Sequence, residues 1–351
     1  MPGAVPTPAL PTPERLLTLV DELADQPVIM LVDLVADRFI TGAPKRISRE
    51  APVLILRYEH EEVLPGGGAN AVANVVALGG RPLPVGIVGA DASGDELLAA
   101  FAARGIPTEG IRRRDGYRTP TKVRILAGGR HSIKQQVVRY DVEGELALAD
   151  EDRAFLDAQL RRLEGQARVA VLSDYGYGAV DPSLVAPARA AVVDSGTLLC
   201  DSRYRLAEFG GVDGATPNEE EAEKTIGRPL GERAALHVAG ATLRERLGAR
   251  FVLVTRGSLG MVLFDDSGCA QVPVHGTDQV ADVTGAGDTV IGTFALALAA
   301  GATPLEAALL ANYAGGVVVM KRGTATLSRE ELRAAIERDR GLATAVRWEA
   351  S

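Results

Sequence analysis

A short stretch near the C-terminal end combines a glycine-rich turn with a single carboxylate. Gly285-Ala286-Gly287-Asp288 is followed by the apolar run 290–296, which indicates a buried helix that begins at the glycines. Backbone N–H groups and the positive end of the helix would then converge on one point, which binds an anion. A carboxylate there is useful if it accepts a proton, which is typical of phosphoryl transfer. The simpler alternative is a tight turn with Asp288 as an ordinary first-turn acid.

Two further groups of residues are candidates for ligand contact. The triplet Gly66-Gly67-Gly68 precedes a predicted helix over 71–78 and permits close backbone approach, while Asn70 offers a donor and an acceptor that suit sugar hydroxyls. Asp33 follows the apolar run 28–32, so a buried strand would end at this carboxylate. A turn without function and a solvated loop acid are the simpler interpretations of these two features.

Alternating strands and helices would position these residues. Apolar runs of strand length, several of them ending in Asp, alternate with helical patterns, which predicts a parallel sheet with ligands at its carboxyl edge. We expect one α/β domain over residues 14–340, between a flexible tail (1–13) and a C-terminal tail (341–351). Predicted strands cover 28–32, 53–58, 84–89, 169–172, 197–200 and 251–255, and predicted helices cover 14–24, 71–78, 91–103, 150–163, 289–299 and 304–319.

One region interrupts this alternation of strands and helices. Residues 121–126 and 136–140 alternate polar and apolar side chains, a pattern typical of an antiparallel hairpin with one wet face. We expect them to form a small lid over a pocket, drawn from about 45–62 and 117–142. The candidates for anion contact on this lid are Lys122, Arg124 and Arg139; the alternative is that they are ordinary exposed strand cations.

Composition limits the class of protein. The 351 residues are 46% hydrophobic, enough for a sizeable core, and the net charge of −8 argues against nucleic acid as a partner. Cys200 and Cys269 fit no disulfide framework or metal-ligand spacing, so we expect a cytoplasmic protein. No apolar run is long enough to span a bilayer, so we expect no membrane segment. His131, His237 and His275 have no spacing typical of a metal site or a triad, and we interpret them as surface or structural residues.

Four motifs occur in an order that resembles a known family. The glycine triplet with Asn70, Asn218-x-x-Glu221, Val254-Thr255-Arg256-Gly257 and 282–288 resemble the ribokinase-like (pfkB-type) carbohydrate kinases over about residues 27–330. Within that family the chain is most similar to the kinase domain of the bifunctional heptose enzyme, which phosphorylates D-glycero-D-manno-heptose 7-phosphate at O1. The residues that support this are Arg46-Ile47-Ser48-x-Glu50, Thr121-Lys122-x-Arg124, Arg139-x-Asp141 and Ser173-Asp174-Tyr175.

The resemblance implies a fold, cofactors and roles for particular residues. It implies a three-layer α/β/α sandwich with a small β lid, a homodimer formed through the lids, and the use of ATP and Mg²⁺. Asp288 would be the base, and the amides of Gly285, Ala286 and Gly287 would form the anion hole. The implied sugar contacts are Asp33, Gly66, Gly67, Asn70, Lys122, Arg139 and Asp174, and the implied nucleotide contacts are Asn218, Thr255, Arg256, Gly257, Asn312 and Gly323. Glu221 and Asn218 would hold Mg²⁺ through water, although Asn218 is explained equally well as a helix N-cap.

Three positions depart from the heptose-kinase pattern. Val32 stands where the family usually has Gly, Tyr177 where heptose kinases carry Lys, and Asp201-Ser202-Arg203 where they carry Asp-Pro-Lys. Arg203 keeps the positive charge of that Lys but presents a planar guanidinium in place of an ammonium group. A kinase for a fructose phosphate or a nucleoside is therefore an alternative. The four histidines include no HxGH-like pair of a nucleotidyltransferase, so we expect kinase activity alone.

Two alternatives come from other functional classes. Gly66-x-Gly68-x-x-Ala71 with Asp91 fits a dinucleotide-binding oxidoreductase, but these glycines do not directly follow a buried strand, and residues 282–288 are then unexplained. A non-catalytic sugar-binding protein would keep the fold without turnover. The presence of Asp288 and both motif glycines argues against this second alternative.

Overall fold

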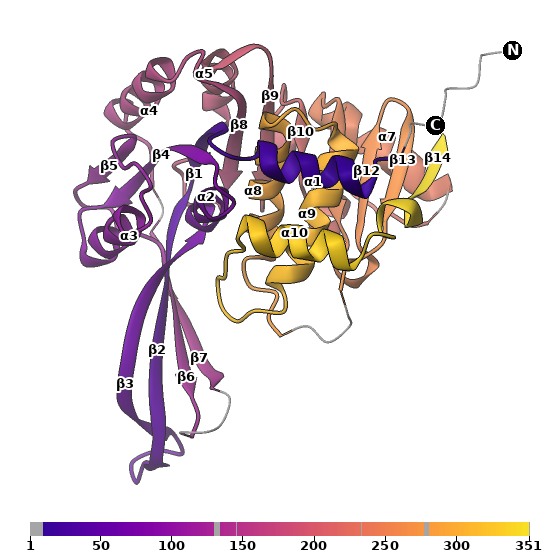
Figure 1. Cartoon of the computed structure of the whole chain (residues 1–351). Helices are drawn as coiled ribbons and strands as arrows, with labels where there is room; N and C mark the ends of the chain where they lie inside the picture. Colours follow the sequence, from indigo (N-terminus) through magenta and orange to yellow (C-terminus); the bar gives the residue numbers. More distant parts are fainter. Residues whose placement is uncertain (1–9, 130–133, 145, 233, 277–280, 351) are drawn as a thin grey trace, which may run out of the picture.

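The computed structural model describes residues 10–129, 134–144, 146–232, 234–276 and 281–350. It contains a ten-stranded sheet between two layers of helices and a separate four-stranded sheet (Figure 1). The expected α/β/α sandwich with a mostly parallel central sheet is confirmed. Within the described ranges, no helix combines the length and apolar character needed to cross a membrane.

The large sheet is parallel through its centre and antiparallel at one edge. Its strand order is β14-β13-β12-β11-β10-β9-β8-β1-β4-β5. The antiparallel strands are β12 (Met261–Asp265), β13 (Gly268–Val272) and β14 (Arg347–Ala350), which continue from β11. The parallel strands are β1 (Pro27–Val32), β4 (Arg81–Gly89), β5 (Ile111–Arg114), β8 (Ala167–Asp174), β9 (Val192–Ser202), β10 (Gly214–Ala215) and β11 (Phe251–Thr255).

Two apolar clusters cover the two faces of this sheet. β1 shows why: Val28, Met30 and Val32 belong to one cluster, and Ile29 and Leu31 belong to the other, because successive side chains of a strand point to opposite faces. The first cluster includes residues of α1 (Pro13–Glu22), α2 (Gly68–Ala77), α3 (Ala92–Ala102), α8 (Ala286–Ala299), α9 (Pro304–Val318) and α10 (Arg329–Arg338). The second includes residues of α4 (Asp150–Arg162), α5 (Val185–Ala191), α6 (Glu219–Ile226) and α7 (Ala234–Leu247). Short 3₁₀ helices cover Pro182–Leu184, Leu206–Glu208, Gly257–Leu259 and Ala343–Ala345.

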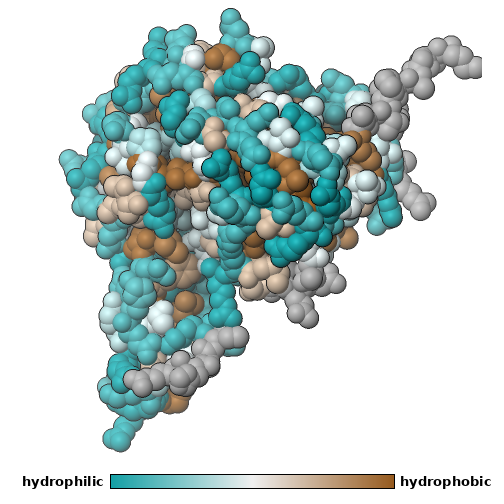
Figure 2. All heavy atoms as spheres, in the orientation of Figure 1, coloured by the Kyte–Doolittle hydropathy of each residue, from teal (hydrophilic) through white to brown (hydrophobic). Residues whose placement is uncertain are grey.

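The small sheet projects away from the body of the molecule (Figure 1). Its order is β3-β2-β6-β7, with bounds β2 (Leu34–Ile47), β3 (Leu54–Gly67), β6 (Thr121–Ala127) and β7 (Gln135–Val142). β2 pairs with β3 in antiparallel fashion and with β6 in parallel. The first strand therefore begins at Leu34, directly after Asp33, well before the start at about 45 that the sequence pattern suggested. In Figure 2 apolar residues appear where this sheet joins the otherwise mainly hydrophilic body.

Several elements of the structure had no clear sequence signal. β5, β10, α7 and α10 were not expected, and residues 347–350, assigned to a C-terminal tail, form β14 and pair with β13. β10 is only two residues long, so no alternating pattern can develop. β14 is recognisable only from its partner strand, which supplies the hydrogen bonds that a four-residue segment cannot make alone.

Candidate active site

Asp288 lies in the first turn of α8, at the carboxyl edge of the large sheet. The helix begins after Gly285, whose φ of +76° is in the left-handed region that favours glycine. A Cβ on Gly285 would lie 2.5 Å from Nδ2 of Asn70, so this glycine also permits close packing. A Cβ on Gly287 would meet nothing within 4 Å, which leaves open space in front of the helix N-terminus. The amides of this turn therefore border an accessible site for an anion.

The carboxylate of Asp288 is buried and hydrogen-bonded. Only 3% of the residue is exposed, Nδ2 of Asn70 donates to Oδ2 at 3.0 Å, and the hydroxyl of Tyr175 donates to Oδ1. Burial raises the pKa of Asp288 to about 6, against the opposing effects of Tyr175, Asn70 and the charge of Lys122. Such a carboxylate is mostly ionised at neutral pH but is a stronger base than a solvated Asp, which suits proton abstraction.

Asp33 holds the segment that carries Tyr175. Its Oδ2 accepts the backbone N–H groups of Tyr175 and Tyr177 at 2.8 and 3.0 Å, and its Oδ1 accepts that of Ala179 at 3.0 Å. The residue is 1% exposed, and burial, followed by the charge of Asp174, raises its pKa to about 6. The carboxylate that ends β1 therefore positions a neighbouring loop of the site.

Asp174, at the end of β8, is also occupied by protein groups. Its Oδ2 accepts the hydroxyl of Ser202 at 2.6 Å, and its Oδ1 accepts the guanidinium of Arg205 at 2.8 Å and the N–H of Gly176 at 3.0 Å. These bonds connect β8, β9 and the loop after β8. Together with Asp33 they fix the backbone on which Tyr175 lies.

The glycine triplet packs against the base of the small sheet. A Cβ on Gly66 would lie 2.6 Å from Cγ of Asp37, and Gly67 has a φ of +51°. Asp37 forms a buried ion pair with Arg124, with Oδ1 and the guanidinium nitrogen 2.6 Å apart. The absence of side chains at the triplet thus lets the end of β3 lie close to this pair and brings Asn70, in α2, to Asp288.

Lys122 and Arg203 carry positive charge toward the site. Lys122 is 8% exposed, its ammonium lies 5.1 Å from the ring centre of Tyr175, and burial lowers its pKa, with Asp37 and Asp288 acting in the opposite sense. The charge of Arg203 acts on both Lys122 and Tyr175. Among the described residues no carboxylate forms an ion pair with Lys122 or Arg203. Arg139 differs, because its guanidinium pairs with Asp141 at 2.6 and 2.8 Å.

Two further carboxylates accompany Asp288. Burial, followed by the charges of Glu221 and Asp288, raises the pKa of Asp201 well above its ordinary value, and burial also raises the pKa of Glu221. Asp201 accepts one hydrogen bond, from Thr216 at 3.3 Å. Carboxylate oxygen atoms suit Mg²⁺, so Asp201 and Glu221 are candidates to hold this cation.

Asn218 is the N-cap of α6. Its Oδ1 accepts the N–H of Glu221 at 2.9 Å, and Oε2 of Glu221 accepts the N–H of Asn218 at 2.9 Å, which is a complete capping box. Asn218 also forms a parallel bridge with Thr255, the last residue of β11. The capping interpretation of Asn218 is confirmed, and Glu221 shares in the cap.

The remaining sequence-predicted residues lie around the ends of β11, β13 and α9. Arg256 pairs with Glu219, with the nearest atoms 2.7 Å apart, and Gly257 begins a 3₁₀ turn with a φ of +55°. Both polar atoms of the Asn312 side chain form hydrogen bonds with the segment after β13. Oδ1 accepts the N–H of His275 at 3.0 Å, and Nδ2 donates to the carbonyl of Pro273 at 2.8 Å.

Gly323 connects the end of this region to the turn that precedes α8. Its N–H donates to Oδ2 of Asp282 at 3.0 Å, and Oδ1 of Asp282 accepts the N–H of Thr284 at 2.9 Å. A Cβ on Gly323, whose φ is +68°, would lie 3.2 Å from the ring of Phe39 in β2. Asp282 therefore ties the α8 turn to a segment that contacts the small sheet.

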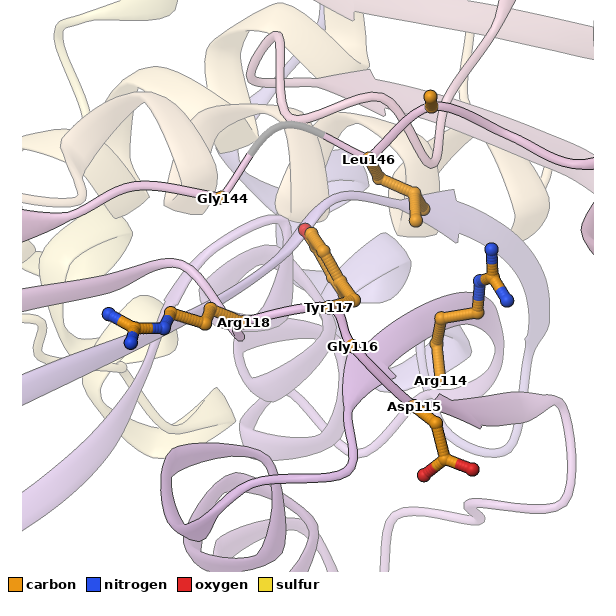
Figure 3. Close-up of a pocket in the computed structure, with 8 residues that line it drawn as sticks. Arg114, Asp115, Gly116, Tyr117, Arg118, Gly144 and Leu146 are labelled. Carbon is orange, nitrogen blue, oxygen red and sulfur yellow. The ribbon is translucent and has the colours of Figure 1, made fainter.

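A separate cavity of about 430 Å³ lies beside the chain between β5 and β6. Tyr117 points toward the segment that contains Gly144 and Leu146, while Arg114 and Arg118 point to opposite sides (Figure 3). Its lining includes none of the residues that the sequence singled out for the site. The convergence of Asp288, Tyr175, Lys122 and the α8 N-terminus is the better candidate for chemistry.

Residues 28–331 match the model of the pfkB family carbohydrate kinase. The chain belongs to the pfkB family of carbohydrate kinases. It is accordingly a phosphotransferase that acts on a sugar alcohol group, and the oxidoreductase alternative has no support.

Relatives and solved structures agree with this assignment. The bifunctional protein HldE of Mesorhizobium japonicum is 38% identical over 333 residues, 94% of this chain and 66% of that protein, and HldE of Azotobacter vinelandii is 41% identical over 323 residues, 90% and 64%. The chain thus spans slightly less than two thirds of the length of these relatives.

Solved structures with a similar fold include phosphofructokinase-2 from Escherichia coli, in complex with substrates and products. It has a TM-score of 0.71 at 20% identity over 89% of this chain and 99% of that chain. Ribokinase of Arabidopsis thaliana, complexed with ribose and ATP, has a TM-score of 0.68 at 22% identity over 90% and 99%. At these identities the two structures establish the ribokinase-like fold.

Two residues around Asp288 were not selected as site residues from the sequence. Tyr175 was noted only as part of a motif, and Asp201 only as the end of a strand and as part of the segment that departs from the heptose-kinase pattern. The available signal was position: both directly follow or end strands of the parallel sheet, at the edge where ligands bind in such folds. His131 lies outside the described residues.

Proposed function

We propose that this chain transfers the γ-phosphoryl group of ATP to O1 of D-glycero-D-manno-heptose 7-phosphate. The observation that carries the proposal is the buried carboxylate of Asp288 at the N-terminus of α8, with its raised pKa and open space in front of Gly287. The heptose substrate is supported by the sequence motifs shared with heptose kinases and by relatives named HldE at 38–41% identity. A fructose phosphate is the second candidate, because phosphofructokinase-2 shares the fold.

In this proposal Asp288 accepts the proton of the attacking sugar hydroxyl. Asn70 and Tyr175 hold its carboxylate in place, and the amides of Gly285, Ala286 and Gly287 stabilise the charge that grows on the phosphoryl group. The N–H of Ala286 donates to the carbonyl of Val283 at 3.2 Å, so the phosphoryl group would have to share or replace this bond. The reaction moves one proton to Asp288 and forms one oxygen–phosphorus bond as another breaks.

The sugar phosphate would lie between the small sheet and α8. We assign Gly66, Gly67, Asn70 and Lys122 to the sugar, with Arg139 at the rim. Asp33 and Asp174 serve this subsite through the loop that they hold. Lys122 and Arg203, which pair with no carboxylate among the described residues, suit the phosphate group that the substrate already carries. An unphosphorylated sugar or nucleoside would supply no phosphate for these two cations to bind.

The nucleotide would occupy the region around the ends of β11, β13 and α9. We assign Asn218, Thr255, Arg256, Gly257 and Gly323 to this subsite, and Asn312 serves it through the segment after β13 that its amide holds. Glu221 and Asn218 would hold Mg²⁺ through water, and Asp201 fits the same donor set. When bound, Mg²⁺ supplies positive charge that neutralises the phosphate oxygens.

We also propose a homodimer formed through the small sheets. Ile40, Ile125 and Val138 lie directly opposite one another across β2, β6 and β7, and a groove of about 550 Å³ runs along this apolar row. Several large apolar side chains of the sheet, and of the turn before β3, are strongly exposed: Ile47, Val53, Leu54, Tyr58, Val137, Val138 and Tyr140. Exposed apolar surface on this scale is typical of an interface.

The substrate assignment is tested by measuring ADP release from ATP and Mg²⁺ with a panel of acceptors. The panel contains D-glycero-D-manno-heptose 7-phosphate, fructose 6-phosphate, fructose 1-phosphate, ribose and a nucleoside. We expect turnover with the heptose phosphate and a product phosphorylated at O1. Turnover only with another acceptor would support the mechanism but contradict the proposed substrate. No ADP release with any acceptor would favour a sugar-binding protein without turnover.

A further inference from the structure

A second group of chemically reactive side chains lies at the antiparallel edge of the large sheet. His237 on α7, Cys269 on β13 and Glu349 on β14 offer one ligand atom each, and these atoms all lie within 4.8 Å of one another. The labels of the three elements lie together near the C-terminus in Figure 1. His237 is 32 residues from Cys269 and 112 from Glu349, so no local spacing could reveal the group.

The distances suit a tetrahedral metal site. Zn²⁺ binds Cys, His and carboxylate ligands at about 2.0–2.3 Å, which places two tetrahedral ligands roughly 3.3–3.7 Å apart. Nε2 of His237 is 3.7 Å from Sγ of Cys269 and 2.9 Å from Oε2 of Glu349. The second distance is that of a hydrogen bond, and a small rotation of the Glu349 side chain, which is 39% exposed, would open it to the spacing of two ligands.

Three features around these side chains support the binding of a cation. Cys269 is fully buried, and a cation that binds its sulfur displaces the thiol proton to solvent. Nε2 of Gln271 donates to Oε1 of Glu349 at 3.3 Å, which orients that carboxylate from the side. A cavity of about 220 Å³ lies beside His237, and its other lining residues include Phe264 and Gly268.

We propose that His237, Cys269 and Glu349 form a zinc site that fastens β14 and α7 to β13. A thiolate, an imidazole and one carboxylate favour Zn²⁺, whereas Mg²⁺ prefers oxygen ligands alone. β14 is the last strand at its edge of the sheet and is only four residues long. A metal that joins it to a helix and to the next strand would stabilise the fold at this edge.

Cobalt is a suitable probe, because Co²⁺ occupies zinc sites and absorbs light when bound by thiolate. The experiment titrates Co²⁺ into the full chain, adds Zn²⁺ in competition, and records thermal unfolding with and without Zn²⁺. The variants are Cys269→Ser and His237→Asn, with Cys200→Ser as the matched control because Cys200 is also fully buried but lies on β9. We expect wild type and the control to show a thiolate-to-cobalt band that Zn²⁺ removes, and a melting temperature that Zn²⁺ raises.

Each variant is compared with itself, with and without metal, so that any cost of the substitution to folding cancels. Cys269→Ser should lose the cobalt band and the stabilisation by Zn²⁺, and His237→Asn should weaken both. A wild-type chain without a thiolate-to-cobalt band would overturn the proposal. So would a band that persists in Cys269→Ser but disappears in Cys200→Ser.

Discussion

At the level of single residues, the basicity of Asp288 depends on a balance between burial and hydrogen bonding. Burial raises its pKa to about 6, and the bonds from Tyr175 and Asn70 limit that rise because they stabilise the charged form. The proposed base must be ionised to accept a proton. Activity should therefore increase with pH through the pKa of Asp288.

Tyr175→Phe tests this balance. Removing the hydroxyl deletes a hydrogen bond that lowers the pKa of Asp288, so the acidic limb of the pH profile of kcat/KM should move to higher pH. Tyr177→Phe is the control, because its backbone N–H is bonded to Asp33 and its hydroxyl, within the described part of the chain, is not bonded to Asp288. An unchanged acidic limb in Tyr175→Phe, or an equal shift in both variants, would show that the hydroxyl of Tyr175 does not tune the base.

Glu221→Gln separates the metal role of Glu221 from its role in the helix cap. Glutamine also completes a capping box, so the melting temperature should change little. The loss of charge should raise the Mg²⁺ concentration at half-maximal activity, on the order of 10-fold. Glu220→Gln, an exposed acid in the same helix turn, is the control. Equal Mg²⁺ dependence in Glu221→Gln and wild type would remove Glu221 from the metal site.

At the level of elements, the turn before α8 contains two glycines with different physical requirements. Gly285→Ala forces a side chain into the left-handed region and against Asn70, which should cost on the order of 1–2 kcal/mol and lower the melting temperature. In Gly287→Ala the added methyl group would have no protein atom within 4 Å, so the melting temperature should equal that of wild type. Its methyl group would project into the proposed phosphoryl site, so kcat/KM should fall on the order of 10²-fold. A Gly287→Ala enzyme with full activity would contradict the proposed position of the anion.

The sequence predicted the elements that carry a strong repeating pattern. β1, β8, β11, α8 and α9 were recognisable because long apolar runs and terminal aspartates or glycines mark buried elements of a parallel sheet. β2 was missed because its first half is buried and its second half is exposed, so a single alternation does not extend over the strand. Its position explains the glycine triplet, which lies against Asp37 and Val35.

Side-chain partners were the least predictable part of the site. Asp33, Asp174 and Asn312 were expected at ligands, and in the structure they hold backbone or side-chain groups of neighbouring loops. A strand that ends in a carboxylate marks the functional edge of the sheet. It does not reveal whether the carboxylate meets the ligand or the loop beside it, because that depends on the path of a distant segment.

At the level of the whole molecule, the apolar row on the small sheet governs the proposed assembly. Val138→Asp places a charge at the end of this row that lies on the edge strand β7, where the residue is 50% exposed, so the monomer should fold normally. We expect the molar mass measured by light scattering to fall by half. Val238→Asp, equally apolar and exposed but on α7, should leave the mass unchanged. A monomeric wild type, or a Val138→Asp chain with the mass of wild type, would contradict the interface.

The proton-accepting role of Asp288 is tested most directly by Asp288→Asn, assayed for phosphoryl transfer and, separately, for binding of the sugar phosphate by calorimetry. The amide keeps the shape and can still bond with Asn70 and Tyr175, but it cannot accept the proton. We predict that kcat falls by at least about 10²–10⁴-fold while the Kd of the sugar phosphate changes little. Turnover at the wild-type rate would contradict the role of Asp288 as base, and loss of sugar binding together with turnover would assign it to the binding of substrate.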